Sequence, residues 1–268
     1  DGTVTLPLEG CNILGELHGN KVEPIKDIRT ALWGSLDEPI GSEALCKPVK
    51  AGNTVALIVS DMSRFWMRQD LVVPHLVDYL TQRCGVQEAD ISIVIANGTH
   101  EGGDEQELRT LVTDAVYDRV RVENHDCEAT DLVYLGTTPH GTPVSINRTA
   151  VQADIVICLG AVTHHVMAGF GGGRKSILPG ISSRETIFHN HAFSLDAAQL
   201  RSNPAIGNGV LKGNPLHEDM CEAAGLVKNL FIINLVMNAQ MQLAAIFSGH
   251  YLSSWEQACR TVDKIYQV

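Results

Sequence analysis

Four continuous apolar runs of strand length stand out along the chain. They are TVALIVS at 54–60, ISIVIA at 91–96, DIVICLG at 154–160 and LFIINLVM at 230–237. A strand that alternates apolar and polar residues has one wet face, whereas a continuous apolar run is buried on both faces. The four runs therefore predict the inner strands of a parallel sheet that helices cover on both sides.

Between these runs, apolar residues recur at helical spacing. The segment 71–84 has this spacing and ends at Gly85, and 104–112 opens with acidic residues, which favour a helix N-terminus. Further helices are predicted at 182–189, 215–224 and 253–265. Strands that alternate with helices indicate an α/β fold with a doubly wound, mainly parallel, Rossmann-like sheet.

The beginning of the chain has a different pattern. Short β-like runs, broken by glycine and proline, predict a β-rich lead-in over residues 1–50. No internal repeat and no low-complexity linker divides the sequence. A length of 268 residues suits one large α/β domain. We therefore predict a single domain over 1–268 that includes this lead-in.

The charge balance narrows the class of partner. Twenty basic and 31 acidic residues give a net charge of −11, and no local basic stripe offsets it. Such a surface repels nucleic acid and anionic membranes, so an anionic substrate needs its own pocket of Arg, Lys or His. No apolar run approaches the ~20 residues of a membrane span, and the N-terminus lacks a signal-peptide pattern. We expect a cytoplasmic protein with neither nucleic acid nor membrane as partner.

The seven cysteines lie far apart in the sequence and form no CxxC pair. This spacing argues against a zinc ribbon and against an iron–sulfur cluster. It predicts free thiols in a reducing cytosol.

Polar, chemically capable residues directly follow three of the predicted strands. The first strand leads into Asp61–Arg64, the second into Asn97–His100, and the third into the glycine-rich stretch Val162–Gly180. In open α/β sheets, ligands bind beyond the carboxyl ends of the strands. The three segments are therefore expected to meet in one crevice.

The sequence GGGRKS at 171–176 invites comparison with phosphate-binding loops. A Walker loop has glycine directly before its Lys-Ser or Lys-Thr pair, and here Arg174 intervenes. The glycines match a Rossmann GxGxxG motif only approximately. The acidic residue that this motif has about 20 positions later could only be Asp196. Glycines ahead of a helix still expose N–H groups that cradle phosphate. A phosphate-binding enzyme that uses Gly171–Gly173 is therefore one alternative function.

The histidines differ in their relation to the predicted strands. His100 ends a glycine turn after a buried strand and is expected to face the crevice. His164 and His165 are successive, so they cannot point the same way, and we favour His165 as functional. His189 and His191 diverge by roughly 200° if they are helical. Structural or surface roles are predicted for His18, His75, His140, His217 and His250.

Four segments, taken in order, resemble the nickel-dependent lactate racemase family. They are SDMSR at 60–64, NGTH at 97–100, HHVMAGFGGGRKSILPG at 164–180 and HNH at 189–191. The third segment is the most specific, because a histidine stands ten residues before a lysine with a glycine-rich link between them. The resemblance runs from about Val55 to about Val236.

Members of that family carry a nickel-pincer nucleotide, a pyridinium mononucleotide whose two sulfur-containing arms hold nickel. The resemblance implies that Lys175 is the covalent tether of this cofactor and that His191 is the nickel ligand. It also implies that His100 and His165 are the catalytic acid/base pair. Nickel with sulfur and imidazole donors is a sensible coordination set.

Asp61 and Arg64 match the Asp-x-x-Arg segment of the family, which lies near the cofactor and the substrate. This position assigns both residues to the cofactor site, and Arg64 is also expected to bind the substrate carboxylate. The chain has Ser63-Arg64-Phe65 where the family has Thr-Arg-Pro. The departure keeps the hydroxyl and the guanidinium in place. Three glycines without side chains leave room for a flat cofactor: Gly171, Gly172 and Gly173.

The activity that the resemblance implies is racemisation or epimerisation of a lactate-like 2-hydroxy acid. The α-hydrogen moves as hydride to the pyridinium, which avoids a carbanion beside a carboxylate. A histidine takes the hydroxyl proton at the same time, because imidazole titrates near neutral pH. A module that binds the nickel-pincer cofactor without turnover is the second alternative function.

Family members usually continue into a second α/β domain that closes over the site, and this chain stops at Val268, about where that domain begins. We therefore expect an N-terminal catalytic and cofactor-binding domain with little or no racemase activity on its own. The expected partners are the 2-hydroxy acid and the proteins that synthesise and insert the cofactor. An oligomer is compatible with the sequence.

Overall fold

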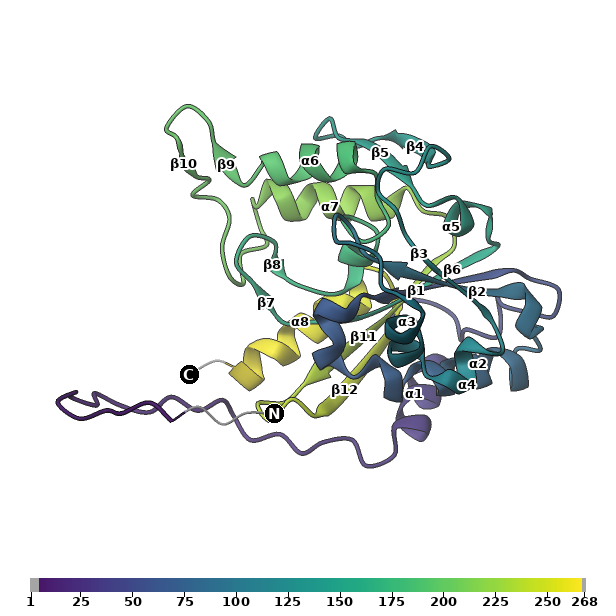
Figure 1. Cartoon of the computed structure of the whole chain (residues 1–268), viewed down its shortest axis with the longest axis horizontal. Helices are drawn as coiled ribbons and strands as arrows, with labels where there is room; N and C mark the ends of the chain where they lie inside the picture. Colours follow the sequence, from purple (N-terminus) through teal and green to yellow (C-terminus); the bar gives the residue numbers. More distant parts are fainter. Residues whose placement is uncertain (1–4, 267–268) are drawn as a thin grey trace.

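Six strands form the central sheet in the order β12-β11-β6-β1-β2-β3 (Figure 1). The computed structural model describes residues 5–266. The strands are β1 (Val55–Ser60), β2 (Ile91–Ala96), β3 (Arg121–Asn124), β6 (Ile155–Ala161), β11 (Leu230–Met237) and β12 (Leu243–His250). All neighbouring pairs are parallel except β11 and β12. The prediction of an α/β fold with a mainly parallel sheet is confirmed.

The four predicted strands are β1, β2, β6 and β11, each within one residue of the predicted bounds. Every residue of β6 is buried, and only the last residue of β1 is partly exposed. Successive side chains of one strand belong to different cores: Leu57 packs in one apolar cluster and Ile58 in another. Burial on both faces explains why these strands are continuous apolar runs.

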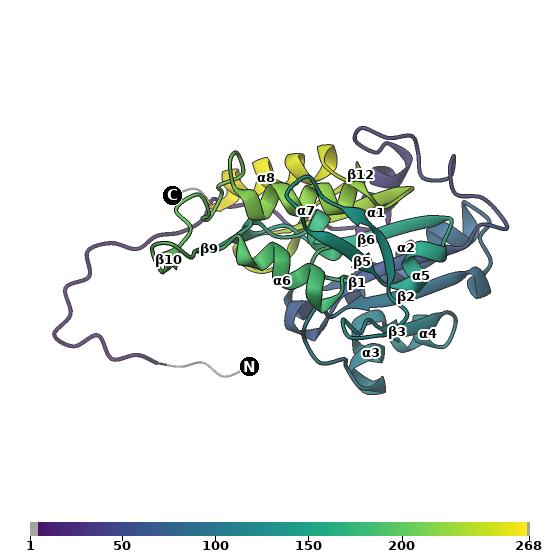
Figure 2. The ribbon, with the colours of Figure 1, turned by 90° about the horizontal axis from the view of Figure 1, so that it is seen from above.

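Helices cover both faces of the sheet (Figure 2). The cluster around Leu57 contains residues of α1 (Ile28–Asp37), α2 (Val73–Gln82), α3 (Glu105–Val112) and α4 (Asp114–Tyr117). The cluster around Ile58 contains residues of α5 (Arg148–Gln152), α6 (Arg184–Ala192) and α7 (Pro215–Gly225). A third, smaller cluster joins α8 (Ser253–Tyr266) to Val236 of β11. The sheet is therefore doubly wound, as predicted.

The five predicted helices are α2, α3, α6, α7 and α8, with ends displaced by up to three residues. Side-chain caps fix the starts of α3 and α6: Asp104 accepts a hydrogen bond from the N–H of Glu107, and Ser183 accepts one from the N–H of Thr186. No helix in the described part of the chain is both long enough and apolar enough to cross a membrane.

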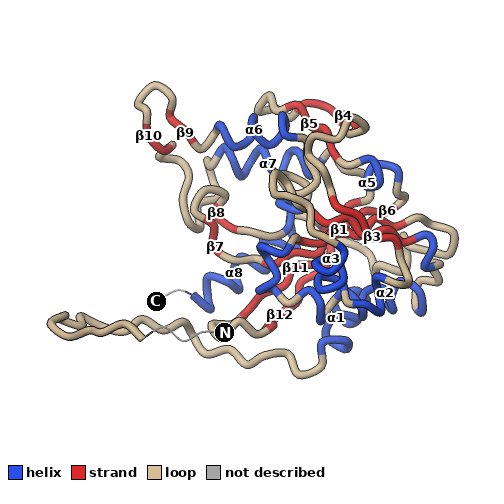
Figure 3. The backbone as a smooth tube through the Cα atoms, viewed as in Figure 1, coloured by secondary structure: helices blue, strands red, loops and turns tan. Residues whose placement is uncertain are grey.

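Several short elements were not predicted, because they contain no continuous apolar run. Three two-stranded sheets interrupt the loops in Figure 3. They are β4 (Val133–Thr137) with β5 (Pro143–Ile146), β7 (His164–His165) with β8 (Gly169–Phe170), and β9 (Leu195–Asp196) with β10 (Arg201–Ser202). All three pairs are antiparallel.

The prediction of a β-rich lead-in over residues 1–50 is wrong. Its described part, residues 5–50, contains the helix α1, which begins after Asp27, whose side chain accepts from the N–H of Thr30. Ile40 adds a single bridge to Gly249. Residues 5–24 run as an extended arm without helix or strand (Figures 1 and 2). A short apolar run becomes a strand only where a partner strand supplies its hydrogen bonds. Positions 1–4 of the predicted lead-in lie outside the described residues.

The prediction that all thiols are free is wrong for two cysteines. Cys46 and Cys84 form a disulfide, with their Cα atoms 4.8 Å apart. Cys46 follows α1 and Cys84 follows α2, and these two helices pack together, so positions 38 residues apart in the sequence meet in space. The other five cysteines are free: Cys11, Cys127, Cys158, Cys221 and Cys259.

Candidate active site

The segments that follow β1, β2 and β6 meet at one cavity of about 340 Å³. This volume lies in the range of ~300–1,000 Å³ that small-molecule sites occupy. Eight of the nine predicted site residues line it: Asp61, Arg64, His100, His165, Gly171, Gly172, Lys175 and His191. Parallel strands end at the same edge of the sheet, which is why residues far apart in the sequence converge here.

His100 is oriented by the carboxylate of Asp61. Its Nδ1 contacts Asp61 Oδ2, and Ser63 Oγ donates to the other carboxylate oxygen at 2.6 Å. Asp61 directly follows β1 and His100 ends the turn after β2, so the parallel neighbours bring them together. A Nδ1–H that donates to a carboxylate leaves Nε2 with its lone pair. The imidazole is thereby arranged as a proton acceptor at Nε2.

Arg64 lies in the 3₁₀ turn η1 (Met62–Met67) and lines the same cavity. Its Nη1 donates to Ser63 Oγ at 3.0 Å. Among the described residues, no carboxylate forms an ion pair with this guanidinium. Its fork of N–H donors is therefore available to a carboxylate or phosphate in the cavity.

The successive histidines 164 and 165 point to different places, as predicted. His164 Nε2 lies 2.9 Å from Asp263 Oδ1, outside the cavity. His165 lines the cavity, and its Nδ1 accepts the backbone N–H groups of Met167 and Ala168 at 3.2 and 3.1 Å. Because Nδ1 is an acceptor, the neutral ring carries its proton on Nε2.

Burial is the main cause that lowers the pKa of His165, to about 4. The nearby charges of Lys175, Arg174, Arg64 and His191 act in the same direction. His165 is therefore neutral at pH 7 and presents Nε2–H as a donor, whereas His100 presents a lone pair.

The glycine loop owes its shape to close backbone approaches. Gly172 has φ +65°, and a Cβ there would lie 2.8 Å from the carbonyl oxygen of Ala161. Gly173 has φ +53°, and a Cβ there would lie 2.5 Å from Trp255 Cδ1. Gly173 does not line the cavity, so its expected contact with the cofactor is replaced by packing against Trp255. Both positions require glycine.

Lys175 lies in the 3₁₀ turn η4 (Gly173–Ser176) and is half-buried in the cavity wall. Burial, and then the charges of Arg174 and Arg64, lower the pKa of the Lys175 amine to about 7. An ordinary lysine is almost wholly protonated at neutral pH, whereas about half of this amine is neutral. Lys175 is therefore arranged as a nucleophile.

α6 separates His189 from His191, because residues two apart on a helix diverge. Only His191 lines the cavity. Its Nδ1 lies 3.0 Å from the carbonyl oxygen of Ile187, which assigns the Nδ1–H tautomer and leaves the Nε2 lone pair for a metal. Burial, and then the charge of Lys175, lower the pKa of His191.

Two aromatic residues in the cavity wall were missed by the sequence reasoning. Trp66 stands two positions after Arg64, and Phe188 directly precedes the HNH motif. Their closeness to the motifs was the available signal. The two rings add to the apolar part of the lining, which also includes Met67 and Ile187.

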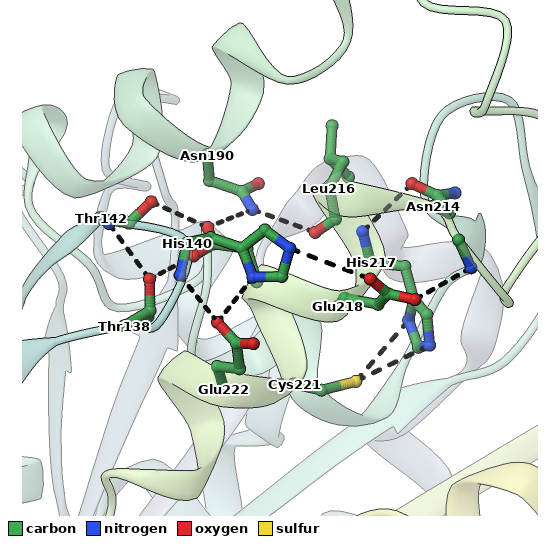
Figure 4. Close-up of polar contacts among 12 residues, drawn as sticks. Thr138, His140, Thr142, Asn190, Asn214, Leu216, His217, Glu218, Cys221 and Glu222 are labelled. Carbon is green, nitrogen blue, oxygen red and sulfur yellow. Dashed lines mark hydrogen bonds and ion pairs between the residues drawn. The ribbon is translucent and has the colours of Figure 1, made fainter.

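A second polar cluster lies away from the cavity, around His140 (Figure 4). His140 Nδ1 lies 2.8 Å from Glu222 Oε2, and the buried Asp219 completes a set that could hold a metal ion. The oxygens of Asp219 already accept hydrogen bonds from Thr138, Thr142 and Asn190. The cluster therefore ties α7 to the β4–β5 hairpin and to α6 through the protein's own donors.

Residues 1–202 match the family model described as the lactate racemase N-terminal domain. The chain is 32% identical over 235 residues to a lactate racemase of Thermoanaerobacterium thermosaccharolyticum, a match that covers 87% of this chain and 53% of that protein. It is 30% identical over 273 residues to a lactate racemase of Lactiplantibacillus plantarum, a match that covers 99% of this chain and 62% of that protein. The chain thus spans between half and two thirds of these relatives.

The solved structures agree. The lactate racemase apoprotein from Thermoanaerobacterium thermosaccharolyticum superposes with a TM-score of 0.84 at 30% identity, over 98% of this chain and 60% of that one. A crystal structure of a protein from Thermotoga maritima superposes with a TM-score of 0.67 at 21% identity, over 89% of this chain and 58% of that one. At this identity the match supports the fold alone.

Proposed function

This chain belongs to the family of lactate racemase N-terminal domains, and on that premise we propose that it is the catalytic and cofactor-binding domain of a racemase or epimerase of a 2-hydroxy acid. The observation that carries the proposal is a single cavity that joins a half-buried lysine to three histidines and an arginine. The activity is proposed for the complete protein, because the chain spans little more than half of its relatives. Proteins that make and insert the cofactor would be its partners.

The residues present fit a nickel-pincer nucleotide. Lys175 offers a partly neutral amine for covalent attachment, and His191 offers Nε2 as a ligand with its ring fixed by the carbonyl of Ile187. Gly172 brings the loop within contact of the end of β6 and keeps that wall free of side chains. When bound, the cofactor would supply a hydride acceptor for the α-hydrogen of the substrate.

Two of the three cavity histidines, His100 and His165, suit complementary tasks. His100, held by Asp61, accepts the hydroxyl proton of the substrate at Nε2. His165, held by two backbone N–H groups, donates a hydrogen bond from Nε2–H to the oxygen of the opposite hand. Arg64 binds the carboxylate that every 2-hydroxy acid carries.

The experiment is to load the chain by co-expression with the proteins that synthesise and insert the cofactor, and then to measure intact mass and bound nickel. We expect an added mass that maps to Lys175 and is absent in Lys175→Ala. We expect His191→Ala to lose nickel and to retain the added mass. No added mass on the loaded wild-type chain would refute the proposal.

Turnover separates a racemase from a module that only binds the cofactor. In the complete protein, His100→Ala and His165→Ala should abolish racemisation of the 2-hydroxy acid while the added mass on Lys175 stays. Loss of 10²-fold or more is the usual effect of removing an acid or base. Full activity in both variants would leave the binding module as the better account.

A further inference from the structure

Arg174, the residue that breaks the Walker pattern, is fully buried, at 0% exposure. Its Nη1 donates to the carbonyl of Phe170 at 2.8 Å, and its Nη2 donates to the carbonyl of Ala168 at 2.7 Å. Within residues 5–266 it forms no ion pair with a carboxylate, and its Nε has no partner. Arginine is almost never fully buried unless it is paired. A charge held in this way needs a reason.

Two stacked rings, Trp255 and His217, take the place of a counter-ion and form what we call the aromatic shelf. The guanidinium carbon of Arg174 lies 3.9 Å from the centre of the Trp255 ring, and Nη2 lies 3.0 Å from His217 Nδ1. His217 stacks on Trp255 at 5.3 Å. Cation–π contact and neutral acceptors stabilise the charge without cancelling it. Trp255 also donates from Nε1 to the carbonyl of Gly171 at 2.8 Å, so the shelf holds the glycine loop itself.

No thiolate neutralises the charge either. Cys221 lies 3.6 Å from His217 Nδ1 (Figure 4), which resembles a catalytic Cys–His pair. Burial raises the pKa of Cys221 to about 11 and lowers that of His217 to about 3, so both stay neutral at pH 7. Burial lowers the pKa of Arg174 only to about 10, so its guanidinium stays charged. The positive field behind the loop is therefore permanent at neutral pH.

Lys175, the next residue, lines the cavity from which Arg174 is absent. We propose that Arg174 is a positioning residue for the covalent tether: it anchors the loop backbone and holds a fixed positive charge in the residue next to Lys175, which makes Lys175 the most reactive lysine. The inference deepens the proposed function, because it concerns the residue to which the cofactor would be attached.

The charged and titratable groups around Lys175 come from several elements. Arg174 precedes it in η4, Arg64 lines the cavity from the segment after β1, and four more groups line the same cavity: Asp61, His100, His165 and His191. Burial disfavours the ammonium most, and both arginines disfavour it further. Of the two arginines, only Arg174 is fully buried and held by backbone carbonyls, since Arg64 lines the open cavity.

The test is competitive labelling of the cofactor-free chain with limiting N-hydroxysuccinimidyl acetate between pH 6 and 10. The amine nitrogen bonds to the acetyl carbon, N-hydroxysuccinimide leaves, and the amine proton goes to water. Peptide mass spectrometry then gives the acetylation of Lys175 relative to Lys212 and Lys228 at each pH. In the wild type we expect a midpoint near pH 7 for Lys175 alone. A midpoint above pH 9 would overturn the proposal.

Three variants separate charge from packing. Arg174→Met removes the charge and keeps most of the length, and should move the Lys175 midpoint up by about one pH unit. Labelling at pH 7 then falls about fivefold, because the neutral fraction of the amine drops from about a half to about a tenth. Arg174→Lys keeps the charge and should retain the wild-type midpoint. Arg260→Met, on the exposed side of α8, removes the same net charge and should change nothing.

The outcomes distinguish a structural role from the proposed one. A loss of labelling that is uniform across the pH range in Arg174→Met would mean that Arg174 only packs the loop, and would overturn the proposal. If Arg174→Met does not fold, the labelling midpoints of Lys175 in the wild type and in Arg174→Lys test the proposal. A higher midpoint in Arg174→Lys than in the wild type would contradict an effect of charge. Labelling uses no cofactor, so its result is independent of whether the loaded chain gains mass on Lys175.

Discussion

Replacing Gly172 by alanine tests whether the glycine loop owes its place to close backbone contact. Two effects add in Gly172→Ala. The residue has φ +65° and ψ −169°, a conformation that is almost confined to glycine and costs an alanine ~1–3 kcal/mol. The added Cβ would also lie 2.8 Å from the Ala161 carbonyl oxygen and 2.8 Å from Val162 Cγ2. Overpacking of this kind costs a further ~1–3 kcal/mol.

Gly213→Ala is the matched control. Its φ of +74° is similar, but nothing lies within 4 Å of the new Cβ. We expect a loss of about 1 kcal/mol in the free energy of unfolding for Gly213→Ala and of about 3 kcal/mol for Gly172→Ala. Urea unfolding, followed by circular dichroism and extrapolated to water, measures both. Equal losses in the two variants would refute the steric argument, because only the backbone term would then remain.

Three further predictions concern stability and turnover. Replacing both Cys46 and Cys84 by serine removes a cross-link with a sequence separation of 38. In the chain-entropy account this should lower the free energy of unfolding by about 4 kcal/mol. Thermal unfolding with and without reductant checks this, and a loss below 1 kcal/mol would contradict it. The hydrogen bond to Glu222 raises the pKa of His140 above 6.5. The stabilisation that this pair gives the fold is therefore full below pH 6.5 and is lost as the pH rises through the raised value. The difference in unfolding free energy between wild type and Glu222→Gln should shrink from pH 6 to pH 8, and a constant difference would count against the pair. Asp61→Asn in the loaded complete protein should lower the rate of racemisation by ~10²–10⁴-fold with the added mass unchanged, since the imidazole that it orients loses its ionic partner; a wild-type rate would exclude that role.

The sequence predicted the inner strands well because burial on both faces leaves an unmistakable pattern. β12 was missed for the opposite reason: its residues 244–247 are only partly buried, and Gly249 breaks the run. Helix α1 was missed because short apolar runs between glycine and proline read equally well as strands. Predictions of this kind depend on tertiary partners that a linear pattern does not contain.

The candidate site was predictable where residues follow buried strands, and unpredictable where side-chain direction decides. His100 and Asp61 could be placed at one edge of the sheet because each belongs to a segment that directly follows a predicted buried strand. The direction of Arg174 could not, because a loop residue next to a cavity lysine gives no sign of being buried on the other side. The disulfide escaped prediction in the same way, since a separation of 38 residues says nothing about distance in space.

The positive cavity within an acidic chain has a kinetic consequence. A net charge of −11 repels a small anion at long range, and this repulsion weakens as salt shortens the Debye length to about 8 Å at physiological ionic strength. Arg64 meets the anion at contact, where salt screens little. Added neutral salt should therefore speed the entry of a 2-hydroxy acid and leave its departure nearly unchanged, opposite to the behaviour of a protein that draws its anionic ligand in by its overall charge.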